Sequence, residues 1–222
     1  MTEAEWLTCD DALRMLPFIG RVLTDSRKVR LLACACCRAV WDDTWPQRSR
    51  EAIVSAELFA NGMLTESELN DFRSLACQSA QNEAVRQSRM RFTEANLVLV
   101  SRLTFAADAA LKSDHIVFKV TVSYPTSSLR ADEEMKAIMP PILKDIFGNP
   151  FCPVTLDPSW LTSDVRLLST SIYADRAFDR LPILADALQD AGCDRDDVLN
   201  HLRGDGPHVL GCWALDLVLG KS

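Results

Sequence analysis

The chain of 222 residues has few of the groups on which common enzyme sites depend. It contains three histidines, so acid–base chemistry near neutral pH has few candidate side chains. It carries no glycine-rich phosphate loop, no nucleophile elbow and no His-Glu-x-x-His metalloprotease motif. These absences predict a chain with no assembled catalytic set and no cofactor, with zinc as the one alternative developed below.

Long apolar runs and an excess of positive charge are also missing. No run approaches the roughly 20 apolar residues of a transmembrane helix, and Met1–Trp6 lacks the basic and apolar regions of a signal peptide. The formal net charge of -7 argues against a nucleic-acid partner, because phosphate contacts need a concentrated positive field. We therefore expect a soluble cytoplasmic protein that binds neither nucleic acid nor membrane.

Cysteine is present, but eight cysteines in 222 residues are too sparse for a disulfide scaffold. We expect reduced thiols that act mostly as small buried apolar groups. Cys34, Cys36 and Cys37 lie in a segment whose apolar residues recur every three or four positions, which predicts burial in a helix core. The alternative is a metal or redox pair made by Cys34 and Cys37, which are neighbours at helical spacing.

That segment predicts a central core helix over Ser26–Trp45. Capping boxes at Thr2–Glu5 and Thr65–Glu68 predict helix starts, because each hydroxyl and each carboxylate can bond to an orphan backbone N–H. Residues 47–60 predict another helix, stopped by the left-handed conformation that Asn61-Gly62 supplies.

Two later segments are harder to assign. Ile116–Tyr124 is rich in β-branched residues, but no second strand pattern lies nearby, so helix or irregular structure is favoured over a strand. Ala131–Phe147 predicts a helix that Pro140-Pro141 interrupts. In the last third, Asp164 and Asp194 are expected to cap helices.

The last third also predicts a helix that starts at Pro182 and a final helix over His208–Leu219. Together these patterns predict an all-α fold, a multi-helix bundle with an extended Pro-rich strap that leads to a C-terminal helical subdomain. The bundle would comprise residues 1–124 and the subdomain residues 125–222, with the strap at 148–158. A single compact domain is the alternative.

One cluster of metal-binding residue types stands out near the C-terminus. Zinc takes about four ligands in a tetrahedron, and Cys and His are its usual donors. The candidate ligands within one short segment are Cys193, His201, His208 and Cys212. On a helix His208 and Cys212 would lie one turn apart, although the spacing is that of no known zinc finger or ribbon. Alternatively, the cysteines are buried apolar residues and His208 caps the last helix.

Motifs along the chain resemble a multi-copy bacterial family of all-helical proteins that has no established activity. They are TEAEWL, RKVRLLACACCR, DIFGNPF, AFDRLPILADAL and GPHVLGCW. The chain departs from the family where Cys152 replaces Arg and Leu202 replaces Cys, and the second change removes a cysteine beside His201. The family's Ala-rich pattern favours helix for Ile116–Tyr124.

Taken together, these features predict a non-catalytic protein-interaction or scaffolding module. The partner would be another protein of unknown identity, and the patterns specify no oligomeric state. The alternative is a zinc sensor or a small metal-dependent enzyme built on the C-terminal Cys/His cluster.

Overall fold

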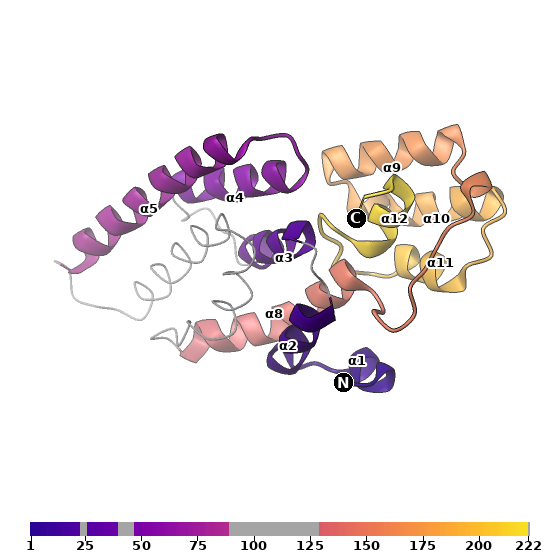
Figure 1. The fold of residues 1–222 in the computed structure, drawn as a ribbon, viewed down its shortest axis with the longest axis horizontal. Helices are drawn as coiled ribbons and strands as arrows, with labels where there is room; N and C mark the ends of the chain where they lie inside the picture. Colours follow the sequence, from indigo (N-terminus) through magenta and orange to yellow (C-terminus); the bar gives the residue numbers. More distant parts are fainter. Residues whose placement is uncertain (23–25, 40–46, 89–128, 222) are drawn as a thin grey trace. The chain divides into compact units, whose positions relative to one another are not determined.

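The computed structural model describes residues 1–22, 26–39, 47–88 and 129–221, and within these ranges the chain is all-helical, as predicted. Ten α-helices and two short 3-10 helices occur there, and no strand does (Figure 1). The helix bounds are α1 Glu3–Thr8, α2 Ala12–Val22, α3 Ser26–Ala39, α4 Gln47–Ala60, α5 Glu66–Ser88, α8 Leu129–Phe147, η1 Pro158–Trp160, α9 Ser163–Asp175, η2 Phe178–Arg180, α10 Leu181–Asp190, α11 Asp196–Arg203 and α12 Trp213–Leu219.

The chain divides into two compact units. One unit contains Met1–Thr8 together with Pro141–Ser222, and we call it the C-terminal unit; the other is Cys9–Pro140. The predicted boundary between residues 124 and 125 falls outside the described residues, as does Ile116–Tyr124, so both assignments stay predictions. None of the described helices combines the length and the apolar character of a membrane span.

The unit Cys9–Pro140 has α3 at its core. The seven consecutive side chains of Leu31–Cys37 are all buried, so the middle of α3 is apolar and buried on every side, which is typical of a central helix. Helix α4 packs against both α3 and α5. The predicted burial of Cys34, Cys36 and Cys37 is confirmed. The predicted extension of this helix to Trp45 lies outside the described residues.

Both predicted capping boxes form in the structure. The Thr2 N–H donates to Glu5 Oε2 at 2.7 Å and the Glu5 N–H donates to Thr2 Oγ1 at 3.3 Å, which confirms the first capping box. The same pair of bonds joins Thr65 and Glu68. The bounds of α4 are those predicted, and Gly62 follows it with φ +71°, a conformation that favours glycine.

Prolines proved weaker helix breakers than predicted. Helix α8 continues through Pro140-Pro141, so the predicted interruption is wrong. A proline inside a helix removes one backbone hydrogen bond and crowds the carbonyl one turn earlier. Here the apolar side chains on either side of Pro140-Pro141, among them Met139 and Ile142, are buried. Tertiary packing supplies most of the stability of a helix in a protein, so it can offset that loss.

In the C-terminal unit, α9 packs against α10 and α12, and α11 packs against the same two helices. Fourteen buried residues form one core cluster. They are Val165, Ile172, Leu181, Leu184, Ala185, Leu188, Cys193, Val198, Leu199, Leu202, Cys212, Ala214, Leu215 and Val218. Helix α1 belongs to the same unit, because the Trp6 indole N–H donates to the Gly148 carbonyl at 2.8 Å, just beyond the end of α8.

Helix starts in this unit differ from three predictions. Thr162, not Asp164, caps α9, and its hydroxyl accepts from the Val165 N–H at 3.3 Å. Helix α11 begins at Asp196 after Arg195, so Asp194 is not its cap. The final helix begins at Trp213 rather than at His208.

Candidate metal centre

Four side chains that can ligate a metal converge in the C-terminal unit. They are Asp145, His201, His208 and Cys212, and one potential ligand atom from each lies within 4.8 Å of the other three. Asp145 belongs to the last turn of α8 and His201 to α11. His208 and Cys212 come from the connection between α11 and α12. Two separate stretches of chain therefore build the group.

Asp145 reaches the group because it lies on the buried face of α8. Its neighbours Ile142 and Ile146 on that face are fully buried, and the Asp145 side chain itself is 3% exposed. The last turn of a helix is an unfavourable place for negative charge, because the helix dipole is negative there. A buried carboxylate also needs compensating partners. The charge of Asp145 therefore has to be stabilised by the groups that face its carboxylate.

The connection from Gly204 to Cys212 is a loop, which explains why the predicted start of the last helix was wrong. Gly206 and Gly211 have φ of +88° and +92°, values that L side chains rarely adopt and that interrupt a right-handed helix. His208 and Cys212 therefore do not share a helical face. They are nevertheless close, with 4.0 Å between Cys212 Sγ and His208 Nδ1.

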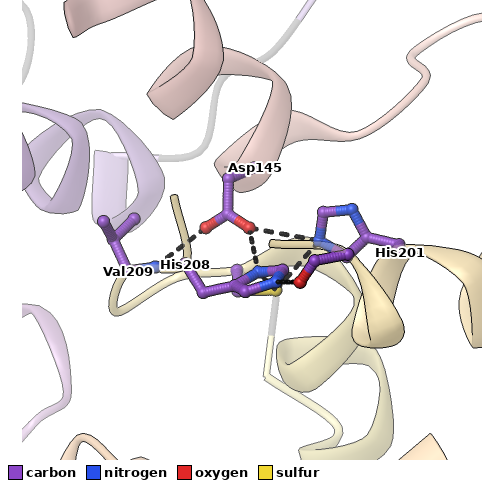
Figure 2. A network of polar contacts seen from close by, with 6 residues as sticks. Asp145, His201, His208 and Val209 are labelled. Carbon is purple, nitrogen blue, oxygen red and sulfur yellow. Dashed lines mark hydrogen bonds and ion pairs between the residues drawn. The ribbon is translucent and has the colours of Figure 1, made fainter. Parts of the chain in front are cut away.

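The shortest contacts in the group all involve a ring nitrogen of a histidine (Figure 2). Asp145 Oδ1 lies 2.8 Å from His208 Nδ1 and 3.1 Å from His201 Nε2. Cys212 Sγ lies 3.2 Å from that same His201 Nε2. In a tetrahedral zinc site with these donors, ligand atoms stand about 3.3 to 3.6 Å apart. These three separations lie just below that range, and the 4.0 Å between Cys212 Sγ and His208 Nδ1 lies above it, so the donors would have to move to hold a metal.

Two backbone groups fix the orientation of the ligand atoms. The Val209 N–H donates to Asp145 Oδ2 at 2.9 Å, which leaves Oδ1 as the oxygen that faces the histidines (Figure 2). His208 Nε2 lies 3.1 Å from the Gly204 carbonyl, which can only accept, so this nitrogen carries a proton. The remaining nitrogen, Nδ1, therefore points at Asp145 Oδ1. Such outer hydrogen bonds are the usual way in which a protein sets the orientation of a metal-binding histidine.

Burial and charge shift the acidities within the group. Burial alone would raise the pKa of Asp145, but the hydrogen bonds and charges of His201 and His208 together hold it below its usual value. Burial would lower the pKa of His208, and the hydrogen bond and charge of Asp145 outweigh that effect and raise it. Burial, with a contribution from the charge of Asp145, raises the pKa of the Cys212 thiol well above its usual value.

These facts argue against a cysteine nucleophile. A Cys–His–Asp relay needs one ring nitrogen of histidine on the thiol and the other on the carboxylate. In His201 the same nitrogen, Nε2, faces both Cys212 Sγ and Asp145 Oδ1. Cys212 is fully buried, and its raised pKa keeps it a thiol rather than the reactive thiolate. Donor atoms that converge on one point suit a cation instead.

Three of the four ligands predicted from the sequence lie in this group, namely His201, His208 and Cys212. Cys193 does not; its side chain is 4% exposed and belongs to the apolar core cluster. Leu202, which stands where the resembling family has Cys, belongs to that core as well. Asp145 was not among the predicted ligands. The signal that could have found it is an acidic residue in the last turn of a helix, on the helix's apolar face.

Cys34, Cys36 and Cys37, for which a metal or redox pair was the alternative to burial, belong to no group of three or more converging metal-binding side chains among the described residues. Within the described residues, the group around Asp145 is the one set of at least three converging Cys, His, Asp or Glu side chains. The seven described cysteines are all free thiols, and six of them, all but Cys152, are buried. Cys34 Sγ instead contacts the Ile53 carbonyl at 3.8 Å. The thiols of α3 thus behave as core residues.

Compared with models of protein families, with curated proteins and with solved structures, the chain matches none. The resemblance to the bacterial multi-copy family therefore stays a prediction, and the function has to be argued from the geometry of the Asp145 group.

Proposed function

We propose that this protein binds one zinc ion through Asp145 Oδ1, His201 Nε2, His208 Nδ1 and Cys212 Sγ. The observation that carries the proposal is that one potential ligand atom from each of these four side chains lies within 4.8 Å of the other three. One thiolate, two imidazoles and one carboxylate form a donor set that zinc accepts, and four such donors complete a tetrahedron.

The proposal also accounts for features that are costly without a metal. Three of the four side chains are at most 7% exposed, and a carboxylate is buried against two imidazoles and a thiol. A divalent cation would compensate the charge of Asp145 and replace the protons that lie between the donors. Without such a cation, the group depends on protonated histidine to balance Asp145.

Zinc in this position would be structural rather than catalytic. Catalytic zinc usually has three protein ligands and one water or substrate, whereas structural zinc has four protein ligands. Because the donors come from the end of α8 and from the segment 201–212, the ion would join these two parts of the C-terminal unit. This role is compatible with the non-catalytic interaction module predicted from the sequence, for which the partner stays unidentified.

Zinc content and affinity test the proposal directly. Protein purified without chelator should contain one zinc per chain, and zinc-free protein should compete with a chromophoric chelator at a Kd of about 10 nM or tighter. His208→Ala and Cys212→Ser should each weaken binding strongly, because each removes one of four ligands. Cys193→Ala is the matched control, since it changes a nearby buried cysteine that lies outside the group.

Cobalt provides a second, spectroscopic readout. Co²⁺ bound in the site should show the intense visible bands of tetrahedral coordination and a thiolate charge-transfer band that Cys212→Ser abolishes. The proposal would be overturned if folded protein neither retained nor took up zinc. It would also be overturned if Cys193→Ala weakened binding as much as Cys212→Ser, because the ligand set would then differ from the converging group.

A further inference from the structure

The four candidate ligands differ in how firmly the protein holds them. Asp145 receives the Val209 N–H, and His208 bonds to the Gly204 carbonyl. Cys212 is fully buried. For His201, no hydrogen bond of its second nitrogen, Nδ1, is found among the described residues. Its side chain is 22% exposed, compared with 7% for that of His208.

Ring packing holds His201 instead. The rings of His201 and His208 pack edge to face, with their centroids 5.1 Å apart and their planes at 85°. On another side Trp213 lies against it, with centroids 5.0 Å apart and an interplanar angle of 47°. Trp213 is therefore the large side chain outside the ligand set that restricts the movement of the His201 ring.

Trp213 is itself held by a close approach to the end of α8. A Cβ atom at Gly148 would lie 2.9 Å from Trp213 Cγ, so a glycine is needed for the indole to pack there. The Gly148 carbonyl accepts the indole N–H of Trp6, which is fully buried. Trp6, Gly148, Trp213 and His201 thus form a continuous line of contacts within the C-terminal unit.

We infer that Trp213 is a positioning residue for the metal centre, and that it sets the rate at which zinc leaves by restraining His201. The inference rests on the zinc site proposed above. Bound metal is lost one ligand at a time, and the first ligand to detach is the one whose movement is least opposed. His201 is that ligand, because it is the most exposed of the four, and behind its ligating nitrogen Nε2 ring packing rather than a hydrogen bond holds the imidazole. Removing the indole removes that restraint.

Zinc transfer from loaded protein to excess chelator tests the inference. Trp213→Ala should release zinc about 10- to 100-fold faster than the parent, the range by which changes around a metal site usually weaken it. Trp213→Phe keeps a smaller ring, so its rate of zinc release should lie between those of the parent and of Trp213→Ala. Trp160→Ala is the matched control, because Trp160 packs against the same core but lies beside Gly192 rather than His201.

Gly148→Ala perturbs Trp213 without altering the indole. The added methyl group would displace the ring, so zinc release should again be faster. Gly220→Ala is its control. Gly220 has a similar backbone conformation, with φ +66° against +60°, but a Cβ there meets no atom within 4 Å. Gly220→Ala should therefore carry the same backbone strain and leave zinc release unchanged.

A role limited to general stability would give a different pattern. In that case Trp160→Ala would release zinc as fast as Trp213→Ala, and the inference would be wrong. Equal release rates for Trp213→Ala and the parent would also refute it while leaving the zinc site intact. Failure of the parent to bind zinc would instead overturn the proposed function. The thiolate band of the cobalt form should persist in Trp213→Ala, showing that the variant does not act through the adjacent Cys212. If Trp213→Ala does not fold, Trp213→Phe and Gly148→Ala decide the question.

Discussion

Replacing Arg38 by alanine should be among the most damaging single changes in the unit Cys9–Pro140. Arg38 lies in the last turn of α3 and Glu57 belongs to α4, and the two side chains form a bidentate ion pair. Arg38 Nε and Nη2 donate to Glu57 Oε1 and Oε2 at 2.7 and 2.8 Å. The Glu57 side chain is 4% exposed, whereas that of Arg38 is 30% exposed. Arg38→Ala would therefore leave a buried carboxylate without its principal cation.

Breaking a buried ion pair from one side costs about 3 to 5 kcal/mol, and the partial exposure of Arg38 places this case near the lower end, at about 3 kcal/mol. Urea unfolding followed by circular dichroism measures the loss as a shift of the midpoint at unchanged slope. The control is Arg48→Ala, which removes the exposed pair Arg48–Glu51 and should cost no more than about 1 kcal/mol.

A double variant separates the buried charge from lost packing. In Arg38→Ala/Glu57→Gln no charge is left buried, so this protein should be more stable than Arg38→Ala alone by about 1 to 2 kcal/mol. The reasoning is refuted if the double variant is as unstable as Arg38→Ala. It is equally refuted if Arg38→Ala costs no more than Arg48→Ala.

Three further outcomes follow from local contacts. Burial of Cys36 raises the pKa of its thiol to about 12. Peptide mapping after brief alkylation of native protein should therefore find Cys36 unmodified and the exposed Cys152 labelled. Cys36→Asp should prevent folding, because it would bury a charge. The backbone N–H and hydroxyl of Thr65 lower the pKa of Glu68. The contribution of this cap to stability should therefore be complete above the unfolded-state pKa of Glu68 and lost as the pH falls through its folded-state pKa. An NMR titration in which Glu68 titrates at or above its usual value would contradict this. Thr162→Ala should lower the free energy of unfolding by about 1 kcal/mol while Thr162→Ser retains most of it, as denaturant unfolding can measure; equal losses in the two variants would mean that the hydroxyl is no cap.

Helix starts were predictable where the signal is local. A capping box needs only residues three positions apart, and both predicted boxes, at Thr2–Glu5 and Thr65–Glu68, form as expected. The α9 start was misjudged by two residues because Thr162 and Asp164 are both plausible caps, and only the backbone geometry chooses between them. Sequence thus locates a helix better than it identifies the capping residue.

Helix interiors and ends were less predictable where tertiary structure overrides local preference. Pro140-Pro141 should disfavour a helix, yet α8 continues through both residues. Conversely, the apolar pattern after His208 fits a helix, yet Gly206 and Gly211 adopt positive φ and the helix starts only at Trp213. For α8, buried neighbours of the two prolines offset the local cost, which a local pattern does not contain. For the last helix, the apolar pattern does not register the positive φ that the two glycines adopt.

Asp145 illustrates why the candidate metal centre could be predicted only in part. It is 63 residues away from His208 in sequence, so no motif spacing connects them. Cys193 is much nearer to the histidines along the chain, yet its side chain faces the apolar core. What marks Asp145 is chemical rather than positional, because a carboxylate on the buried face of a last helical turn is unfavourable unless cationic or hydrogen-bonding groups oppose it. Two of the three histidines in the chain supply those groups, and the same requirement makes the site receptive to a cation.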